Sequence, residues 1–231
     1  MKVIITGATK GIGRAMAEAF AKEGADLAIC ARTAADLDVL KADFKTNFPS
    51  VEVFTQIVDM SKKASVLQFA AAVKSHWGQI DVLVNNAGLF IPGEVSKEED
   101  GALEKMIETN LYSAYHLTRA ILPAMEAKGH IFNICSIASV IAYPNGGSYS
   151  ISKFALLGFS KVLREELKEQ GIKVTAILPG ATWSASWAGV DLPESRLMQA
   201  TDIANSVVGA WKMGPSAVVE EIIIRPQLGD L

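Results

Sequence analysis

The stretch Val3-Ile-Ile-Thr-Gly-Ala-Thr-Lys-Gly-Ile-Gly-Arg-Ala-Met-Ala-Glu-Ala-Phe20 decides the fold of this chain. It opens with a short apolar run, continues with a glycine-rich loop, and ends with apolar residues that recur at helical spacing from Ile12 onward. This order predicts a buried strand, a tight loop and an amphipathic helix.

The same alternation of strand and helix patterns continues along the chain. Further strands are predicted at residues 27–31, 51–58, 80–84, 130–135, 174–178 and 218–224. Helices are predicted at about residues 34–44, 61–76 and 99–127, around Tyr149 up to about residue 170, and from about Asp202. We expect Ser61 to cap the helix over 61–76, and Pro123 to bend the helix over 99–127. The alternation predicts an α/β, doubly wound, Rossmann-like fold: one seven-stranded parallel sheet with helices on both faces, whose ligands bind beyond the carboxyl ends of the strands.

Length, composition and charge fit one domain of the α/β type. The chain has 231 residues, half of them hydrophobic, so we expect a single domain over residues 1–231. A formal charge of −3 offers no basic surface for nucleic acid, and no run of about 18 apolar residues suggests a membrane span. Cys30 and Cys135 fall in predicted buried strands, and the histidines lack metal-ligand spacing. We expect a cytoplasmic protein with no metal, no nucleic-acid partner and no membrane association.

The glycine loop predicts an anion site. Gly7, Gly11 and Gly13 let the chain turn tightly and let backbone amides approach a pyrophosphate at the positive end of the following helix. The alternative is that they are turn glycines without a ligand. Their place between a buried strand and an amphipathic helix favours a dinucleotide cofactor.

The end of the second strand bears on which dinucleotide binds. Such sites usually have an acid here that accepts hydrogen bonds from the ribose hydroxyls, but this strand is followed by Arg32, and Lys10 lies in the glycine loop. Two cations could converge on a 2′-phosphate, which favours NADPH, with NADH as the alternative. Both residues could instead be ordinary solvated cations.

Two further strand ends carry candidate contacts with the cofactor. Asp59 could accept from the adenine amino group, with Met60 supplying a backbone contact, or Asp59 could cap the next helix. Asn85 to Gly88 could line the cofactor, or could simply form a turn that ends a strand.

Three side chains in the second half of the chain suit chemistry at a carbonyl group. Tyr149 and Lys153 are four residues apart, so a helix places them on one face, where the ammonium can lower the pKa of the phenol toward that of a useful proton donor. Ser136 would polarise the same carbonyl oxygen. Alone, a tyrosine and a lysine at this spacing occur on many helix surfaces.

Together these motifs make the chain resemble the compact form of the short-chain dehydrogenase/reductase family over essentially its whole length. The resemblance rests on Thr6-Gly-x-x-x-Gly-x-Gly13, Asn85-Asn-Ala-Gly88, Asn110, Ser136, Tyr149-x-x-x-Lys153 and Pro179-Gly180, with twelve residues between the serine and the tyrosine. It implies a homodimer or homotetramer in which the helices around Asn110 and Tyr149 pack between subunits.

The resemblance also implies roles for the central residues. Tyr149 would donate the proton to the carbonyl oxygen, and Ser136 would orient that oxygen. Lys153 would lower the pKa of Tyr149 and bind the nicotinamide ribose, while the backbone of Asn110 would hold a water that links Lys153 to solvent. Asn110 could otherwise be a polar residue in a long helix.

For the cofactor, the resemblance and the strand-end motifs together predict one set of residues. They are Gly7, Thr9, Lys10, Gly11, Ile12, Gly13, Arg32, Thr33, Asp59, Met60, Asn86, Ala87, Gly88, Tyr149, Lys153, Pro179, Gly180, Thr182 and Ser184. The implied activity is that of an NADPH-dependent carbonyl reductase acting on a small carbonyl compound or secondary alcohol. The alternatives are an NADH-linked 3-hydroxy-acid or 3-oxoacyl enzyme, and a non-catalytic nicotinamide-nucleotide sensor.

The substrate lid, at about residues 181–201, is short, which resembles the sepiapterin-reductase-like and 3-hydroxy-acid-dehydrogenase-like branches of the family. Large side chains in and near it suit a flat or apolar carbonyl compound. They are Trp183, Trp187, Met198, Phe90 and Tyr143. Packing of the lid, or a subunit contact, would explain them equally well.

Overall fold

The computed structural model of the protein describes residues 1–183 and 192–230. Within them, the predicted seven-stranded sheet is confirmed, with strand order β3-β2-β1-β4-β5-β6-β7 and parallel pairing throughout. The strands are β1 Lys2–Thr6, β2 Asp26–Ala31, β3 Val53–Ile57, β4 Ile80–Asn85, β5 Met125–Ile134, β6 Lys173–Pro179 and β7 Glu221–Ile224. The order reverses between β1 and β4, which is where doubly wound sheets form their ligand crevice.

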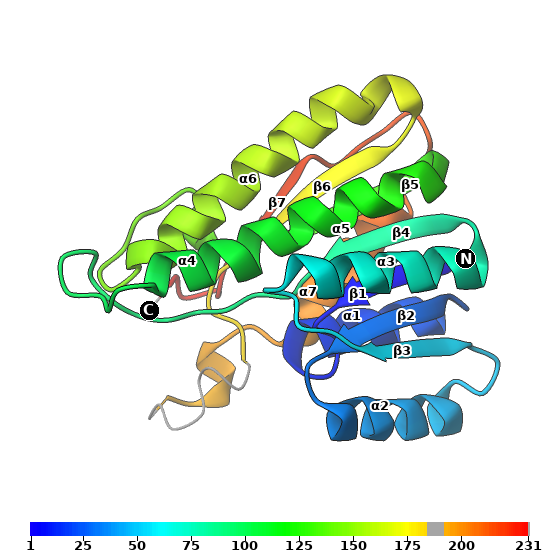
Figure 1. The fold of residues 1–231 in the computed structure, drawn as a ribbon. Helices are drawn as coiled ribbons and strands as arrows, with labels where there is room; N and C mark the ends of the chain where they lie inside the picture. The colour runs from blue at the N-terminus through cyan, green and yellow to red at the C-terminus, as the bar shows by residue number, and fades with distance from the viewer. Residues whose placement is uncertain (184–191, 231) are drawn as a thin grey trace.

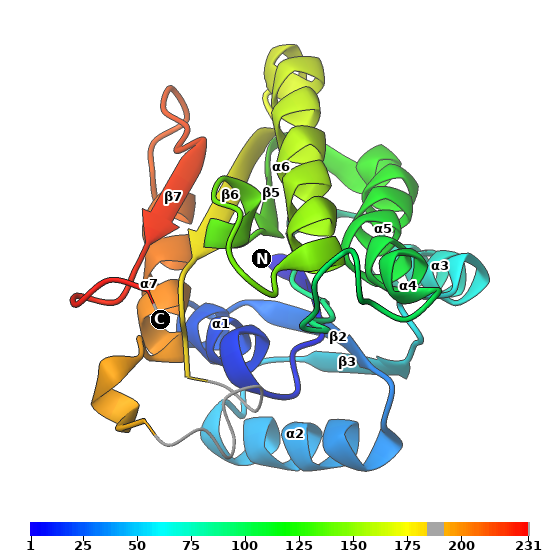
Figure 2. The ribbon, with the colours of Figure 1, turned by 90° about the vertical axis from the view of Figure 1, so that its left-hand side faces the viewer.

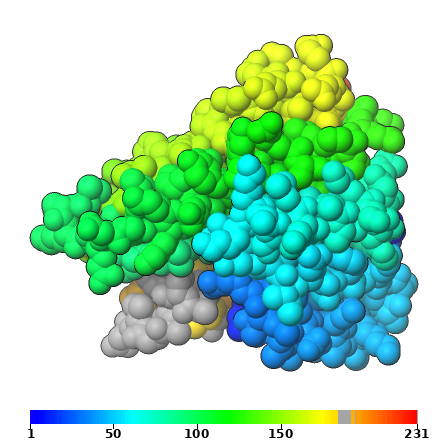
Figure 3. Space-filling view, viewed as in Figure 1, coloured from blue at the N-terminus to red at the C-terminus, as the bar shows by residue number. Residues whose placement is uncertain are grey.

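Helices cover both faces of this sheet (Figures 1 and 2). On one face lie α1 Gly11–Lys22, α2 Ala34–Asn47 and α7 Ala200–Trp211. On the other lie α3 Lys63–Trp77, α5 Ser113–Ile121 and α6 Gly147–Leu167, and Figure 3 shows the molecule from the side of these three helices. The short α4 Ala102–Ile107 leads into α5 through a π-helical turn, Glu108–Tyr112. Brief 3₁₀ turns occur at Leu122–Ala124, Ile137–Ser139, Lys168–Gln170 and Glu194–Arg196.

The strands read as unbroken apolar runs because both faces of the sheet are buried. Ile5 packs in the cluster beneath α1, α2 and α7, whereas its neighbour Ile4 packs in the cluster beneath α3 and α5, and both are fully buried. Each such side chain contributes about 1.5–3 kcal/mol through removal from water. No described helix is both long and apolar enough to span a membrane.

Two local predictions were wrong. The helix expected over residues 99–127 ends at Ile121, because Pro123 lies in a 3₁₀ turn and β5 already begins at Met125. Proline has no amide N–H to donate, and its ring clashes with the backbone carbonyl of the preceding helical turn. Pro123 therefore ends this helix instead of bending it. Ser61 does not cap α3: the cap position is occupied by Lys62, without a capping hydrogen bond from its side chain.

Candidate active site

Most of the predicted site residues lie at or just after the carboxyl ends of the strands and at the start of α6, while Asn110 lies in the π-helical turn before α5. Figure 2 views the molecule from this side. Residues 7–13 follow β1, residues 32–33 follow β2, residues 59–60 follow β3, residues 86–88 follow β4, Ser136 follows β5, and residues 180–182 follow β6. The fold therefore gathers the predicted residues at one edge of the sheet. Ser184 and Trp187 lie outside the described residues.

The glycine loop is packed closely against the loop after β4. Gly7 and Gly11 have φ angles of +65° and +55°, which glycine adopts without strain. A Cβ atom at Gly13 would lie 2.5 Å from the Asn86 Nδ2 atom and 2.9 Å from the Ala8 Cα atom. Only glycine at this position lets α1 begin so close to the sheet. No described side chain caps α1 at Lys10, so the first amide groups of the helix face the loop uncapped.

Thr6, the last residue of β1, joins the two loops. Its hydroxyl oxygen accepts hydrogen bonds from the backbone N–H groups of Asn86 and Ala87, at 3.0 and 2.9 Å. In return, the Asn86 side-chain amide donates to the carbonyls of Thr6 and Gly7, at 2.9 and 3.1 Å. These bonds hold the Asn-Ala-Gly turn beside the glycine loop. No role was predicted for Thr6, although its position between the strand and Gly7 was a usable signal.

The two cations expected near a 2′-phosphate are placed differently. Lys10 is exposed, and its ammonium lies 3.0 Å from a carboxylate oxygen of Asp36 in the first turn of α2. Arg32 is exposed and has no ion pair with any residue of the described ranges. Thr33 occupies the cap position of α2, but its hydroxyl makes no capping hydrogen bond. Arg32 and Thr33 are therefore free to meet an anion, whereas Lys10 would have to leave Asp36.

Asp59 takes part in a local turn. Its Oδ1 atom accepts from the backbone N–H and the hydroxyl of Ser61, at 3.0 and 2.8 Å, and the hydrogen bond from the Ser61 hydroxyl is the main cause that lowers the pKa of Asp59. Met60 is buried, with its sulfur 3.7 Å from the Cys30 sulfur. Asp59 thus orders the approach to α3 without capping it, and its contact with adenine stays a prediction.

Tyr149 and Lys153 lie together on α6, with the Lys153 ammonium 5.8 Å from the centroid of the tyrosine ring. The ammonium is buried, donates to the carbonyl of Ile134 at 2.8 Å, and has its pKa lowered to about 8 by desolvation. Burial raises the pKa of Tyr149, and the neighbouring Ser136 side chain opposes that rise. The pKa of Tyr149 is therefore raised in this structure, whereas the sequence led us to expect that Lys153 would lower it.

Asn110 lies in the π-helical turn between α4 and α5, at 1% exposure. Its side-chain oxygen accepts from the N–H of Leu89 at 2.6 Å, and its amide donates to the Leu89 carbonyl at 2.9 Å and to the Ser152 hydroxyl at 2.8 Å. The Ser152 hydroxyl donates in turn to the backbone carbonyl of Tyr149 at 2.7 Å. Asn110 is thus tied to the helix that carries Tyr149, beyond being a polar residue in a helix. Ser152 went unnoticed in the sequence, although it lies one helical turn after Tyr149.

Aromatic side chains border Tyr149. The ring of Phe90 meets that of Tyr149 edge to face, with centroids 4.9 Å apart. Tyr143 has its pKa raised to about 12 by burial and by the nearby Tyr149. Phe90 and Tyr143 remain 43% and 38% exposed, so apolar surface is available beside the phenol.

The base of the predicted lid is closed by backbone hydrogen bonds. The N–H of Trp183 donates to the Met198 carbonyl at 2.8 Å, and the N–H of Met198 donates to the Ala181 carbonyl at 3.1 Å. Met198 is buried in the core cluster that also holds residues of α7, which agrees with the packing alternative for this side chain. Gly180 donates its N–H to the carbonyl of Ile224 at 2.7 Å, which joins this turn to β7.

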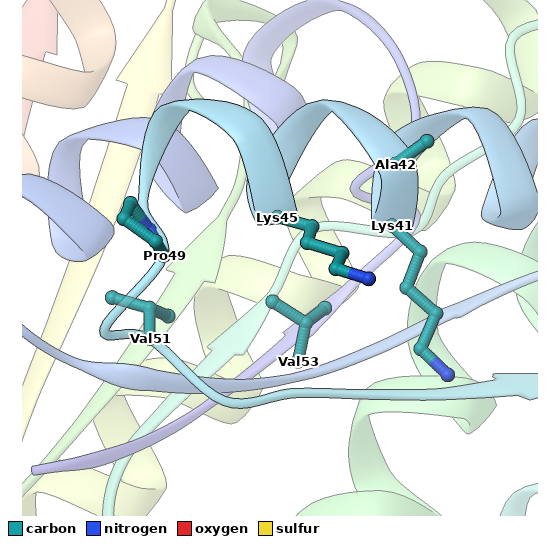
Figure 4. Close-up of a pocket in the computed structure, with 6 residues that line it drawn as sticks. All are labelled: Lys41, Ala42, Lys45, Pro49, Val51 and Val53. Carbon is teal, nitrogen blue, oxygen red and sulfur yellow. The ribbon is translucent and has the colours of Figure 1, made fainter.

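A hollow elsewhere on the described surface is separate from the predicted site residues. A shallow hollow of about 270 Å³ lies between α2 and the beginning of β3, lined by two lysines and apolar side chains (Figure 4). Its residues, Lys41, Ala42, Lys45, Pro49, Val51 and Val53, include none of the predicted site residues. Among the described residues, no group of three histidine, cysteine or acidic side chains is placed to hold a metal ion.

Comparisons with known proteins give one consistent family. Residues 1–193 match the family model described as short chain dehydrogenase. The sepiapterin reductase of Chlorobaculum tepidum is 34% identical over 239 residues, which cover 99% of this chain and 97% of that protein.

Solved structures extend the likeness to the whole fold. An alcohol dehydrogenase from the archaeon Thermococcus sibiricus, complexed with 5-hydroxy-NADP, matches with a TM-score of 0.90 at 28% identity, covering 98% of this chain and 96% of the other. The L-sorbose reductase of Gluconobacter frateurii, complexed with NADPH and L-sorbose, matches with a TM-score of 0.87 at 29% identity, covering 96% and 94% of the two chains.

Proposed function

The chain belongs to the short-chain dehydrogenase family, and we propose that it is an NADPH-dependent oxidoreductase that interconverts a small carbonyl compound and its secondary alcohol. The observation that carries the proposal is that the Ser136 side chain and the Lys153 ammonium both lie next to Tyr149. Lys153 is buried there, and a Cβ at Gly88 would lie only 3.7 Å from its ammonium.

The residues present fit a nicotinamide dinucleotide. The uncapped start of α1, kept close to the sheet by Gly13, would hold the pyrophosphate, and the Asn86-Ala-Gly88 turn would line the path toward Lys153. When bound, the nicotinamide would supply hydride to the carbonyl carbon or accept it from the alcohol carbon. Pro179, which ends β6, and Gly180 and Thr182, which follow it, would border the nicotinamide. Ser184 is part of the same proposal by sequence position.

The chain's own residues would move the proton. In the direction of reduction, the Tyr149 hydroxyl donates its proton to the carbonyl oxygen, and Ser136 orients that oxygen by a hydrogen bond. The raised pKa of Tyr149 keeps the phenol protonated in the free protein, as a donor requires. Lys153 stabilises the phenolate that forms, since its charge lies in a buried, poorly screened site.

Preference for NADPH rests on the end of β2. Arg32 would meet the 2′-phosphate, with the uncapped start of α2 at Thr33 beside it, and Lys10 would join after leaving Asp36. The NADP-type ligands of the two structural relatives support the same preference. The alternative, an NADH-linked 3-hydroxy-acid or 3-oxoacyl enzyme, requires that Arg32 remain in solvent when the cofactor binds.

The substrate we propose is flat and uncharged near its carbonyl group. Phe90 and Tyr143 supply aromatic surface next to the Tyr149 phenol, which suits a ring compound such as a pterin. The likeness to a sepiapterin reductase agrees with this substrate class.

We further propose a single domain with a substrate lid at about residues 181–201, assembled as a homodimer or homotetramer. The outward faces of α5 and α6 support a subunit contact, because large apolar side chains are exposed there. These are Tyr115, Ile151, Phe154 and Val162. A cytoplasmic location remains a prediction from the sequence.

The test is a direct assay of turnover. NADPH or NADH would be mixed with the protein and with pterin, diketone, 3-oxo acid, quinone and aromatic aldehyde substrates, and loss of the reduced cofactor would be followed by absorbance. We expect turnover with NADPH and at least one ring carbonyl. Tight binding of NADPH with no turnover of any substrate would instead favour a nucleotide sensor.

A further inference from the structure

The helix that carries Tyr149 is capped by a residue from a distant loop. At its start, Gly146 provides no side chain, and no local side chain caps α6. The Glu98 carboxylate takes that place: one oxygen accepts the N–H of Ser148 at 2.8 Å, and the other accepts the Ser148 hydroxyl. A carboxylate here also faces the positive end of the α6 dipole. Ser148 is 3% exposed and directly precedes Tyr149.

The backbone is shaped around this carboxylate. Gly147 has a φ angle of +30°, and a Cβ there would lie 2.9 Å from the Glu98 Cδ atom. A Cβ at Gly93 would lie 2.6 Å from the Glu98 Cγ atom, and the Gly93 N–H donates to the carbonyl of Asn145 at 3.0 Å. Glycine is thus found where the two segments approach most closely.

The loop that supplies Glu98 is fixed at its other end as well. Asn110 holds the backbone of Leu89 and, through Ser152, the Tyr149 carbonyl. Phe90 follows Leu89 directly, and its ring contacts the ring of Tyr149. The loop over residues 89–98 is therefore bound to α6 at both ends, each time within one helical turn of Tyr149.

We propose that Glu98 is a positioning residue for the reaction. Its bonds to Ser148 fix the first turn of α6, and with it the direction of the Tyr149 phenol, and they hold the loop that presses Phe90 against the tyrosine ring. This inference rests on the proposed function of Tyr149. It assigns to Glu98 no contact with substrate or cofactor.

The test compares Glu98→Ala, Glu98→Gln and Glu94→Gln. Glutamine keeps an acceptor oxygen for the Ser148 N–H, so it should restore most of what alanine loses. Glu94 is the matched control, since it lies on the same loop and its carboxylate pairs at the surface with Lys97. We would measure kcat and KM for a ring carbonyl and for a small ketone, the Kd of NADPH, and hydrogen exchange of the amides at 147–150.

Glu98→Ala should lower kcat at least tenfold for both substrates and raise KM mainly for the ring carbonyl, while the Kd of NADPH changes less than threefold. Exchange at 147–150 should rise in Glu98→Ala and stay unchanged in Glu94→Gln. An unchanged kcat, unchanged exchange, or an equal loss in Glu94→Gln would overturn the proposal. If the unaltered protein reduces no carbonyl, the proposed function fails instead, and the exchange data still decide whether Glu98 fixes the first turn of α6.

Discussion

The ammonium of Lys153 lies 5.8 Å from the centroid of the Tyr149 ring and donates to the main chain of β5 at Ile134. The lysine is therefore held against the sheet, and it acts on the phenol through its charge at a distance. Its burial leaves that charge weakly screened, but burial also makes the charge easier to lose.

The first prediction concerns the pH dependence of carbonyl reduction. The pKa of Lys153 is lowered to about 8, so the ammonium loses its proton as pH rises through that value. We expect kcat to fall above about pH 8, because neutral Lys153 cannot stabilise the phenolate. Lys153→Met should lower kcat by about 10²-fold or more below about pH 8, with a difference that shrinks at higher pH, and should remove this limb of the profile. A wild-type kcat that stays constant to pH 10 would contradict the role of the lysine charge.

The second prediction concerns the choice of cofactor. Loss of a charge-assisted contact with a phosphate costs about 1.5–3 kcal/mol, so Arg32→Ala should raise the Kd of NADPH by about 10- to 100-fold. The Kd of NADH should change less than twofold. Lys10→Ala should have a smaller effect, because Lys10 is 68% exposed and already paired with Asp36. Fluorescence titration of both cofactors against each variant measures this, and equal effects on NADPH and NADH would show that Arg32 does not bind the 2′-phosphate.

The order of strands and helices could be read from the sequence because each strand is an unbroken apolar run that ends in a recognisable loop. The helix boundary near Pro123 was missed because apolar residues continue at helical spacing on both sides of it. The pairing of β5 with β4 identifies this segment as a strand, with His130 opposite Val82, and such pairing between strands cannot be read from the local sequence pattern. The central site residues were named from motifs whose order matches the strand ends.

Contacts between distant segments could not be predicted from the sequence. Glu98 and Ser148 are 50 residues apart, and neither lies in a pattern that marks a helix cap. The ion pair of Lys10 with Asp36 likewise depends on how two helices start at one sheet edge. The rise in the pKa of Tyr149 follows from burial, and burial is a property of the packed structure.

The third prediction concerns the close approach at Gly13. Alanine there must displace either the Asn86 amide or the glycine loop, so Gly13→Ala should lower the free energy of unfolding by about 1–3 kcal/mol and weaken NADPH binding at least tenfold. Gly209→Ala is the control. Gly209 lies exposed on α7 with open space around it, and alanine should raise stability by about 0.5–1 kcal/mol. Chemical denaturation and cofactor titration measure both effects, and unchanged binding in Gly13→Ala would be the contrary result.

The fourth prediction concerns acid stability. His130 is buried beside Phe132, and its Nε2 atom lies 2.7 Å from the hydroxyl of Thr175, which itself donates to the Val219 carbonyl. Nε2 must therefore carry the ring proton, and Nδ1 has no partner among the described residues.

Burial lowers the pKa of His130 from 6.5 to about 3, so between these values the unfolded chain binds a proton that the folded protein does not. The contribution of His130 to stability is thus complete above about pH 6.5 and is lost as pH falls toward 3. Over this range the free energy of unfolding should fall by up to about 1.4 kcal/mol per pH unit. His130→Gln should flatten the dependence of unfolding free energy on pH in this window. If both proteins lose stability with the same slope, His130 does not cause the acid sensitivity.

The measurement that tests the central claim most directly is the kcat of Tyr149→Phe with NADPH and the best ring carbonyl found for the unaltered protein. This change removes one hydroxyl and keeps the ring that packs against Phe90. We predict that kcat falls by at least about 10²-fold, as for loss of a general acid, while the Kd of NADPH stays within twofold. A kcat within threefold of the unaltered protein would contradict the assignment of Tyr149 as the proton donor.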